Sequence, residues 1–123
     1  MARIRPRSGG PENWWALDAV AVLIFAAIGR VSHDEGFTLS GVVDTAFPFL
    51  GGVLIGWAVI EWRKWEALGW RAALGVLVPA LVVGMIGRRL LGDGTAPAFV
   101  AVATVVLAVL FLGWRLAVRL IRR

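Results

Sequence analysis

Two arginines stand where apolar runs end, and residues suited to anion binding lie near them. Arg30 is followed by His33, and Arg88 occupies the matching place in a later run. Thr45 and Thr95 begin the two runs that come next. Free N–H groups and the positive dipole end at a helix N-terminus favour negative charge. These five residues therefore form a candidate binding layer for a carboxylate, a phosphate or an anionic headgroup.

A structural interpretation of the same residues is also open. Asp44 and Asp93 can cap the two following helices and pair with Arg30 and Arg88. Arginines at helix ends commonly extend toward the membrane interface without binding a ligand. The single histidine, His33, can act as a pH-sensitive group or simply be solvated.

Asp18 is the only acidic residue inside a predicted membrane span. Carboxylates within a membrane are costly and are functional candidates, and a proton-coupled transporter would need one. Asp18 lies about one turn from the helix start, where water, Arg63, Lys64 or Arg71 could reach it. It could instead stabilise the positive first turn of its own helix. We favour a structural role because of this shallow depth.

Four runs with almost no charge must position these residues. The chain has 123 residues, of which 59 % are hydrophobic and 17 % charged, whereas soluble domains carry about a quarter charged residues. Apolar helices near the bilayer thickness are most stable in lipid. We predict an all-α, four-helix transmembrane bundle in a multi-pass protein of the bacterial cytoplasmic membrane. The transmembrane domain covers residues 13–115, with helices at about 14–30, 45–60, 69–88 and 95–115.

The basic residues indicate an orientation. Ten Lys and Arg residues lie in the N-terminal segment, in the loop after the second helix, and between Arg115 and Arg123, against Arg30, Arg88 and Arg89 on the other side. By the positive-inside rule both termini are cytoplasmic. Residues 1–12 then form a basic cytoplasmic segment, and residues 116–123 form a basic amphipathic cytoplasmic tail.

A cleaved signal peptide is the alternative for the first helix. Ala27-Ile28-Gly29 resembles a cleavage site, but Asp18 interrupts the apolar region and Arg30 follows the site at once. We therefore predict a retained helix.

Composition argues against several classes of chemistry. The absence of cysteine excludes disulfides and thiolate metal sites, and one histidine argues against a zinc or haem centre. The net charge of +5 is confined to short loops and termini beside apolar runs, which membrane headgroups explain better than nucleic acid. We expect no metal, no cofactor, no nucleic-acid partner and no enzymatic activity.

Two stripes of small residues predict close helix contacts. Gly52 and Gly56 form one stripe, and Ala80 and Gly84 form the other. Such stripes let helices approach closely within one chain, which is the commoner use, or join two copies as a homodimer.

The two halves of the chain share a short motif. Ile28-Gly29-Arg30 and Ile86-Gly87-Arg88 are each followed, five residues later, by an acidic residue and a glycine, and then by a Thr-Ala pair. Such a repeat predicts two helical hairpins related by an axis along the membrane normal. Chance is the alternative, since glycine is common at helix ends.

Several segments resemble a known family. They are Phe25–Arg30 with Ser32-His33, Thr45–Leu50, and Phe99-Val100 leading into Leu112–Arg115. They are similar to an uncharacterised family of small four-helix integral membrane proteins that is common in actinobacteria. The resemblance extends from about Leu17 to Arg115. It implies the fold and the membrane location, but no activity and no site residues.

Two functions remain open at this stage. One is transport of a small anion or amphiphile by a homodimer, with the outer-face layer as its binding site. The other is a non-catalytic lipid-binding, accessory or scaffold subunit of a membrane complex. A water-accessible path to Asp18 would favour transport, whereas a closed core would favour the accessory role.

Overall fold

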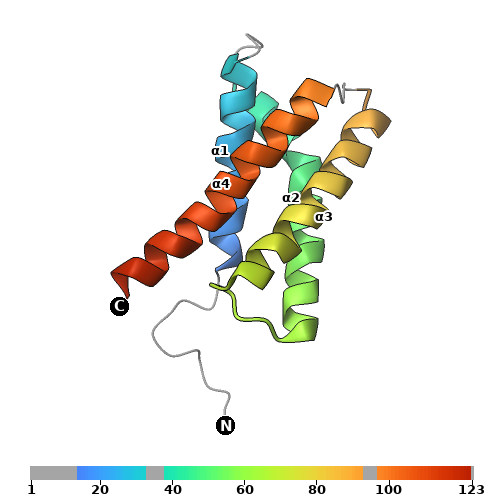
Figure 1. The fold of residues 1–123 in the computed structure, drawn as a ribbon. Coiled ribbons are helices and arrows are strands. Elements are labelled where there is room, and N and C mark those ends of the chain that lie inside the picture. Colours follow the sequence, from blue (N-terminus) through green and yellow to red (C-terminus); the bar gives the residue numbers. More distant parts are fainter. Residues whose placement is uncertain (1–13, 33–37, 93–96, 123) are drawn as a thin grey trace.

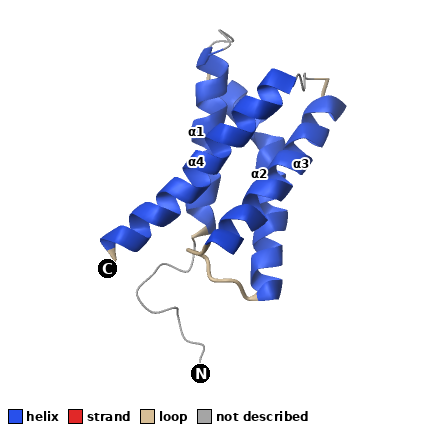
Figure 2. Cartoon of the chain, viewed as in Figure 1, coloured by secondary structure: helices blue, strands red, loops and turns tan. Residues whose placement is uncertain are grey.

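The computed structural model describes residues 14–32, 38–92 and 97–122. Four helices make up most of this part of the chain, and it contains no strand (Figure 2). The helices are α1 (Trp15–Ser32), α2 (Leu39–Arg63), α3 (Trp70–Leu90) and α4 (Pro97–Ile121). The predicted all-α four-helix bundle is therefore confirmed. The basic segment 1–12 lies outside the described residues.

The helices alternate in direction along the chain (Figure 1). The start of α1, the end of α2, the start of α3 and the end of α4 consequently lie at one end of the bundle. All seven tryptophans lie within about two turns of these helix termini, so we call this the tryptophan end. They are Trp14, Trp15, Trp57, Trp62, Trp65, Trp70 and Trp114.

Three of the described helices, α2, α3 and α4, are long and apolar enough to cross a membrane. The 25 residues of α2 and of α4 extend over about 37 Å, more than the roughly 30 Å hydrocarbon core. Many large apolar side chains on these helices are not covered by the rest of the chain. Membrane association explains this surface, because lipid is the solvent that such side chains prefer.

The tightest helix pair is α2 and α3, and small residues allow it. A Cβ atom on Gly52 would overlap the Pro79 carbonyl oxygen and the Ala80 Cα. A Cβ atom on Gly56 would lie 2.6 Å from the Gly75 carbonyl oxygen. The two backbones therefore touch at positions where any side chain would hold them apart.

The second small-residue stripe also packs within the chain. Ala80 is fully buried, and a Cβ atom on Gly84 would overlap the ring of Phe49. Both stripes are therefore covered by neighbouring helices. A homodimer through either of them would require the bundle to open.

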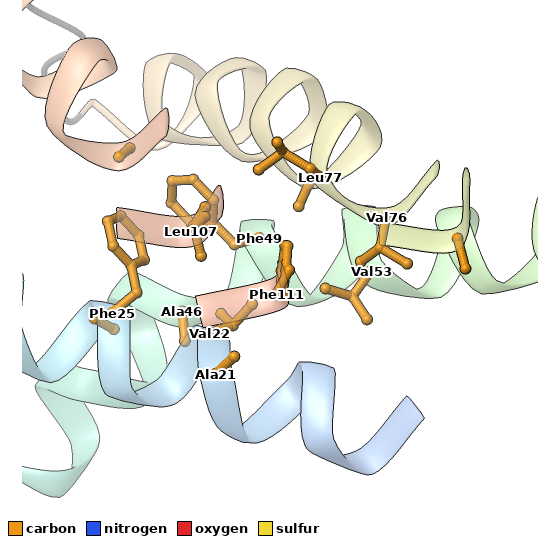
Figure 3. Packing of buried hydrophobic residues seen from close by; sticks show 14 of the residues in the cluster. Ala21, Val22, Phe25, Ala46, Phe49, Val53, Val76, Leu77, Leu107 and Phe111 are labelled. Atoms are coloured by element: carbon orange, nitrogen blue, oxygen red, sulfur yellow. The ribbon is translucent and has the colours of Figure 1, made fainter. Parts of the chain in front are cut away.

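The apolar core lies where the four helices meet (Figure 3). Phe25 of α1 contacts Phe49 of α2 edge-on, with ring centroids 5.0 Å apart. It also contacts Phe99 of α4 at 6.2 Å. From α4 only a narrow stripe of side chains enters the core, including Leu107 and Phe111. This helix consequently leaves most of its surface uncovered.

The start of α2 differs from the prediction. The helix begins at Leu39, and the Thr38 hydroxyl caps it by accepting a hydrogen bond from the Gly41 N–H at 3.0 Å. The predicted start at Thr45, after Asp44, is wrong, because Asp44 lies within the helix and does not precede it. A capping threonine satisfies a free N–H of the first turn and fixes the start earlier.

The end of α4 also lies beyond the predicted end at residue 115. The helix continues to Ile121, so residues 116–121 of the predicted tail are its last turns. Leucine, alanine and arginine are good helix formers, and they favour this continuation. Arg115 therefore lies well inside α4 and not at its last residue.

Candidate functional site

The described structure contains a buried ion pair between its first and last helices. Asp18 lies in the first turn of α1 and is 0 % exposed. Arg115 lies in α4 and is 2 % exposed. Among the residues that the structure describes, Asp18 and Arg115 are the two charged residues that are buried. Charged side chains are this deeply buried only when they are paired, so their contacts decide what they can do.

The guanidinium and the carboxylate meet side by side. One terminal nitrogen of Arg115, Nη2, donates to Asp18 Oδ2 at 2.7 Å. The other, Nη1, donates to Oδ1 at 2.8 Å. Two parallel charge-assisted hydrogen bonds of this kind are the strongest and most directional contact between these groups.

Two tryptophans complete the surroundings of the carboxylate. The indole N–H of Trp57, from α2, donates to Asp18 Oδ2 at 2.8 Å. The indole N–H of Trp114, from α4, donates to Oδ1 at 2.8 Å. Each carboxylate oxygen therefore accepts two hydrogen bonds, which fills the lone-pair positions that a carboxylate offers. We call Asp18, Trp57, Trp114 and Arg115 the ion-pair cluster.

Two further donors of Arg115 bind backbone. Its Nε donates to the carbonyl oxygen of Ala67 at 2.8 Å, and Nη1 also reaches the carbonyl of Phe111 at 3.2 Å. Ala67 belongs to the turn between α2 and α3. The cluster thus connects α1, α2, α4 and this turn at the tryptophan end.

Aromatic rings shield the pair from its surroundings. The guanidinium carbon of Arg115 lies 4.5 Å from the ring centroid of Trp114, a cation–π contact. The Trp114 ring in turn stacks on Trp14, with centroids 5.6 Å apart and planes 21° from parallel. Shielding from solvent strengthens each hydrogen bond inside the cluster.

This arrangement suits holding helices together and does not suit exchanging a substrate. A carboxylate whose oxygens already accept four N–H groups can bind a ligand only after one of those bonds breaks. Removing one member of a buried ion pair typically costs about 3–5 kcal/mol. The pair also neutralises Asp18, so α1 does not bring an uncompensated charge into an apolar region.

The sequence pointed to Asp18 but to the wrong partners. Its carboxylate is bound by Arg115 and not by Arg63, Lys64 or Arg71, and the shallow position in α1 is as predicted. Arg115 was missed because it was counted among the cytoplasmic charges of the tail. The available signal was the amphipathic stretch after it, which continues α4 and places Arg115 well inside a helix.

The residues of the predicted anion layer are distributed differently. Arg30, at the end of α1, lies so close to the first turn of α2 that a Cβ atom on Gly41 would overlap its guanidinium. Arg88, at the end of α3, lies over the ring of Phe99 in the first turn of α4, at 4.1 Å. Each arginine thus packs on the first turn of the next helix, and neither is without a partner.

The threonines of that layer do not complete a site. Thr45 is the seventh residue of α2 and not its first, so its N–H is not one of the free groups of the helix start. His33 and Thr95 lie outside the described residues. Among the residues that the structure describes, no group of three His, Asp or Glu side chains could hold a metal ion.

Comparison with known proteins places the chain in a family. Residues 15–118 match the model of a family described as a protein of unknown function (DUF3054). The chain belongs to the DUF3054 family. The matched region of this DUF3054 member contains all four helices nearly completely, and it includes Asp18 and Arg115. Neither the search of curated proteins nor the search of solved structures gives a match.

Proposed function

We propose that this DUF3054 protein is a non-catalytic membrane protein that crosses the bilayer four times and acts as an accessory or scaffold subunit. The observation that supports this function best is the closure of the ion-pair cluster. Asp18 is 0 % exposed and accepts hydrogen bonds from Trp57, Trp114 and Arg115. A carboxylate whose oxygens are both occupied in this way has a structural role, because the loss of either charged partner would leave an uncompensated buried charge.

Transport is the competing function, and it requires the ion-pair cluster to open as well as to hold the helices together. A transported ion or proton would have to reach Asp18 or Arg115, and the cluster would have to open in each cycle. That opening would break hydrogen bonds to both oxygens of Asp18, and a partner left buried without the other would be an uncompensated charge. The outer layer gives transport little support either, because Arg30 and Arg88 both have partners within the chain.

The proposed four crossings require α1 to cross the membrane together with α2, α3 and α4, which are long and apolar enough to do so. Its one acidic side chain is neutralised by Arg115, which lowers the cost of placing α1 in lipid. Because Arg115 is buried, it no longer counts as a cytoplasmic charge. The remaining Lys and Arg residues are still distributed nine to three in favour of the tryptophan end and the chain termini. This asymmetry favours cytoplasmic termini.

The exposed surface of α4 supports an accessory role in which the protein acts by binding another membrane component. Only a narrow stripe of α4 is buried, and large apolar side chains cover much of the rest. Val105, Val109 and Leu116 are between 58 % and 62 % exposed. In a membrane this face meets lipid or another membrane protein, and helices associate there by packing.

Reconstitution into liposomes tests the proposal. Vesicles containing the protein should release trapped chloride, phosphate and protons no faster than empty vesicles. An Asp18→Asn variant should behave the same, and an Asp44→Asn variant serves as the control because Asp44 is an exposed carboxylate of α2. A saturable flux of any of these ions in vesicles containing the wild-type protein, absent from empty vesicles, would establish transport instead.

A second measurement addresses the accessory role itself. Purification in native lipid particles followed by mass spectrometry should give a complex heavier than one chain, with a bound component at fixed stoichiometry. A bare chain with flux activity would contradict the proposal.

A further inference from the structure

The turn between α2 and α3 combines cations with tryptophans in an ordered arrangement. The segment of residues 61–71 includes the last residues of α2, the turn itself and the first residues of α3. It carries Arg63, Lys64 and Arg71. The guanidinium carbon of Arg63 lies 5.5 Å from the ring centroid of Trp62 and 5.7 Å from that of Trp65. We call this segment the basic turn. The guanidinium group of Arg63 therefore lies beside two aromatic rings, although the side chain is exposed.

A second stacked cation stands at the start of α3. The guanidinium carbon of Arg71 lies 5.4 Å from the ring centroid of Trp70. Both Arg63 and Arg71 remain exposed, as do the outer tryptophans, with Trp62 73 % and Trp70 62 % exposed. Exposed cations beside exposed tryptophans are typical of the layer where headgroups meet acyl chains.

The basic turn is fixed to the bundle at several points. Trp65 packs on α3 so closely that a Cβ atom on Gly75 would lie 2.8 Å from its ring. Ala67 accepts a hydrogen bond from Arg115 of the ion-pair cluster. Lys64 ends α2 in the left-handed conformation, with φ of 57°. A fixed backbone lowers the entropy lost when the turn binds a ligand.

The two ends of the bundle differ in both aromatic residues and charge. No tryptophan lies near the opposite end, and the sequence next to Arg30, Arg88 and Arg89 includes four acidic residues. At the tryptophan end the exposed cations of the described chain outnumber the acidic groups Glu61 and Glu66. Glu61 also has a partner within the chain. A negatively charged headgroup is therefore complementary to the basic turn and not to the opposite end.

We propose that the basic turn is a binding site for an anionic phospholipid, with Arg63 and Arg71 contacting the headgroup phosphate and Trp62 and Trp70 contacting the glycerol and upper acyl region. The site rests on the proposed insertion in a membrane but not on the accessory role. Guanidinium groups suit phosphate because they present several donors in one plane. The aromatic rings suit the interface because they are apolar with one polar edge.

Nanodiscs of defined composition test this site. The full chain is placed in phosphatidylcholine alone or in phosphatidylcholine with about a third phosphatidylglycerol. Native mass spectrometry then counts retained phosphatidylglycerol, and thermal unfolding gives the midpoint in each lipid. We expect wild-type protein to retain phosphatidylglycerol preferentially and to unfold at a higher temperature in its presence.

Two double variants remove the same number of charges at opposite ends. Arg63→Gln with Arg71→Gln should weaken retention of phosphatidylglycerol about twenty-fivefold, at about fivefold for each surface cation. Arg88→Gln with Arg89→Gln is the matched control and should leave retention within about twofold of wild type. Arg63→Lys with Arg71→Lys keeps the charge and should restore most of the retention, which separates lost binding from lost folding.

Three results would overturn the site. One is equal retention of both lipids by wild-type protein, and another is an equal loss in the two double variants. The third is a rise in unfolding temperature with inorganic phosphate that matches the rise with phosphatidylglycerol, since the ligand would then be free phosphate. Failure of the wild-type chain to insert into nanodiscs at all would instead contradict the membrane proposal itself.

Discussion

Replacing Asp18 by asparagine should destabilise the protein far more than any exposed carboxylate can. The Asp18→Asn side chain keeps the shape of the original but offers two N–H donors in place of one oxygen. Each oxygen of Asp18 accepts from one indole and one guanidinium N–H. In either orientation the amide therefore faces two donors, and Arg115 is left as a buried uncompensated cation.

The magnitude follows from burial and from the lost bonds. Removing one partner of a buried ion pair costs about 3–5 kcal/mol. Asp18 is 0 % exposed and Arg115 is 2 % exposed, so solvent cannot compensate in the folded state. We therefore expect Asp18→Asn and Arg115→Met each to lower the free energy of unfolding by about 3–5 kcal/mol.

The double variant separates pairing from general damage. With both charges removed, no buried charge is left uncompensated, so the combined loss should be smaller than the sum of the single losses by about 2–3 kcal/mol. The free energy is measured by denaturant titration in mixed micelles, followed by tryptophan fluorescence. The control Asp44→Asn alters an exposed carboxylate and should change it by less than about 0.5 kcal/mol.

The reasoning fails on either of two outcomes. If the single losses simply add, Asp18 and Arg115 do not interact in the membrane-embedded protein. If Asp18→Asn costs no more than Asp44→Asn, the carboxylate is solvated and the cluster is open.

Two further predictions concern the packing and the boundaries of the helices. Gly52→Ala should cost more than about 2 kcal/mol because its methyl group would overlap the backbone of α3, whereas Gly29→Ala meets nothing within 4 Å and should be neutral or stabilising in the same titration. Equal effects of the two alanines would show that α2 and α3 do not touch at Gly52. Thr38→Ala should cost about 1 kcal/mol by removing the cap of α2, and Thr45→Ala should cost less because Thr45 lies within the helix. A larger loss of stability for Thr45→Ala than for Thr38→Ala would show that α2 begins at Thr45.

The sequence predicts the fold well because hydropathy alone separates membrane helices from loops. Runs without charge are long, and lipid leaves helices as the suitable structure for them. Boundaries are less well determined, because a charge such as Asp44 is tolerated inside the 25-residue helix α2. The capping role of Thr38 depends on local geometry that hydropathy does not contain.

The site is harder to predict than the helices that position it. Asp18 stands out as an acidic residue in an apolar run, but its partner Arg115 is 97 residues away in the sequence. Which helix faces Asp18, and with which side, depends on packing. The indole of Trp57 looks like any other interfacial tryptophan until the contact is seen. Small-residue stripes are the exception, since close approach is the physical reason for their composition.

Hydrogen exchange of the tryptophan indoles tests the closed cluster most directly, because it needs no substitution. In the membrane-embedded protein, nuclear magnetic resonance can follow each indole N–H after transfer to deuterated buffer. Trp57 and Trp114 donate to Asp18, whereas Trp62 and Trp70 are exposed. We predict that the first two indoles exchange much more slowly than the last two. Equally rapid exchange of all four would show that water reaches Asp18, and the sealed structural role would be contradicted.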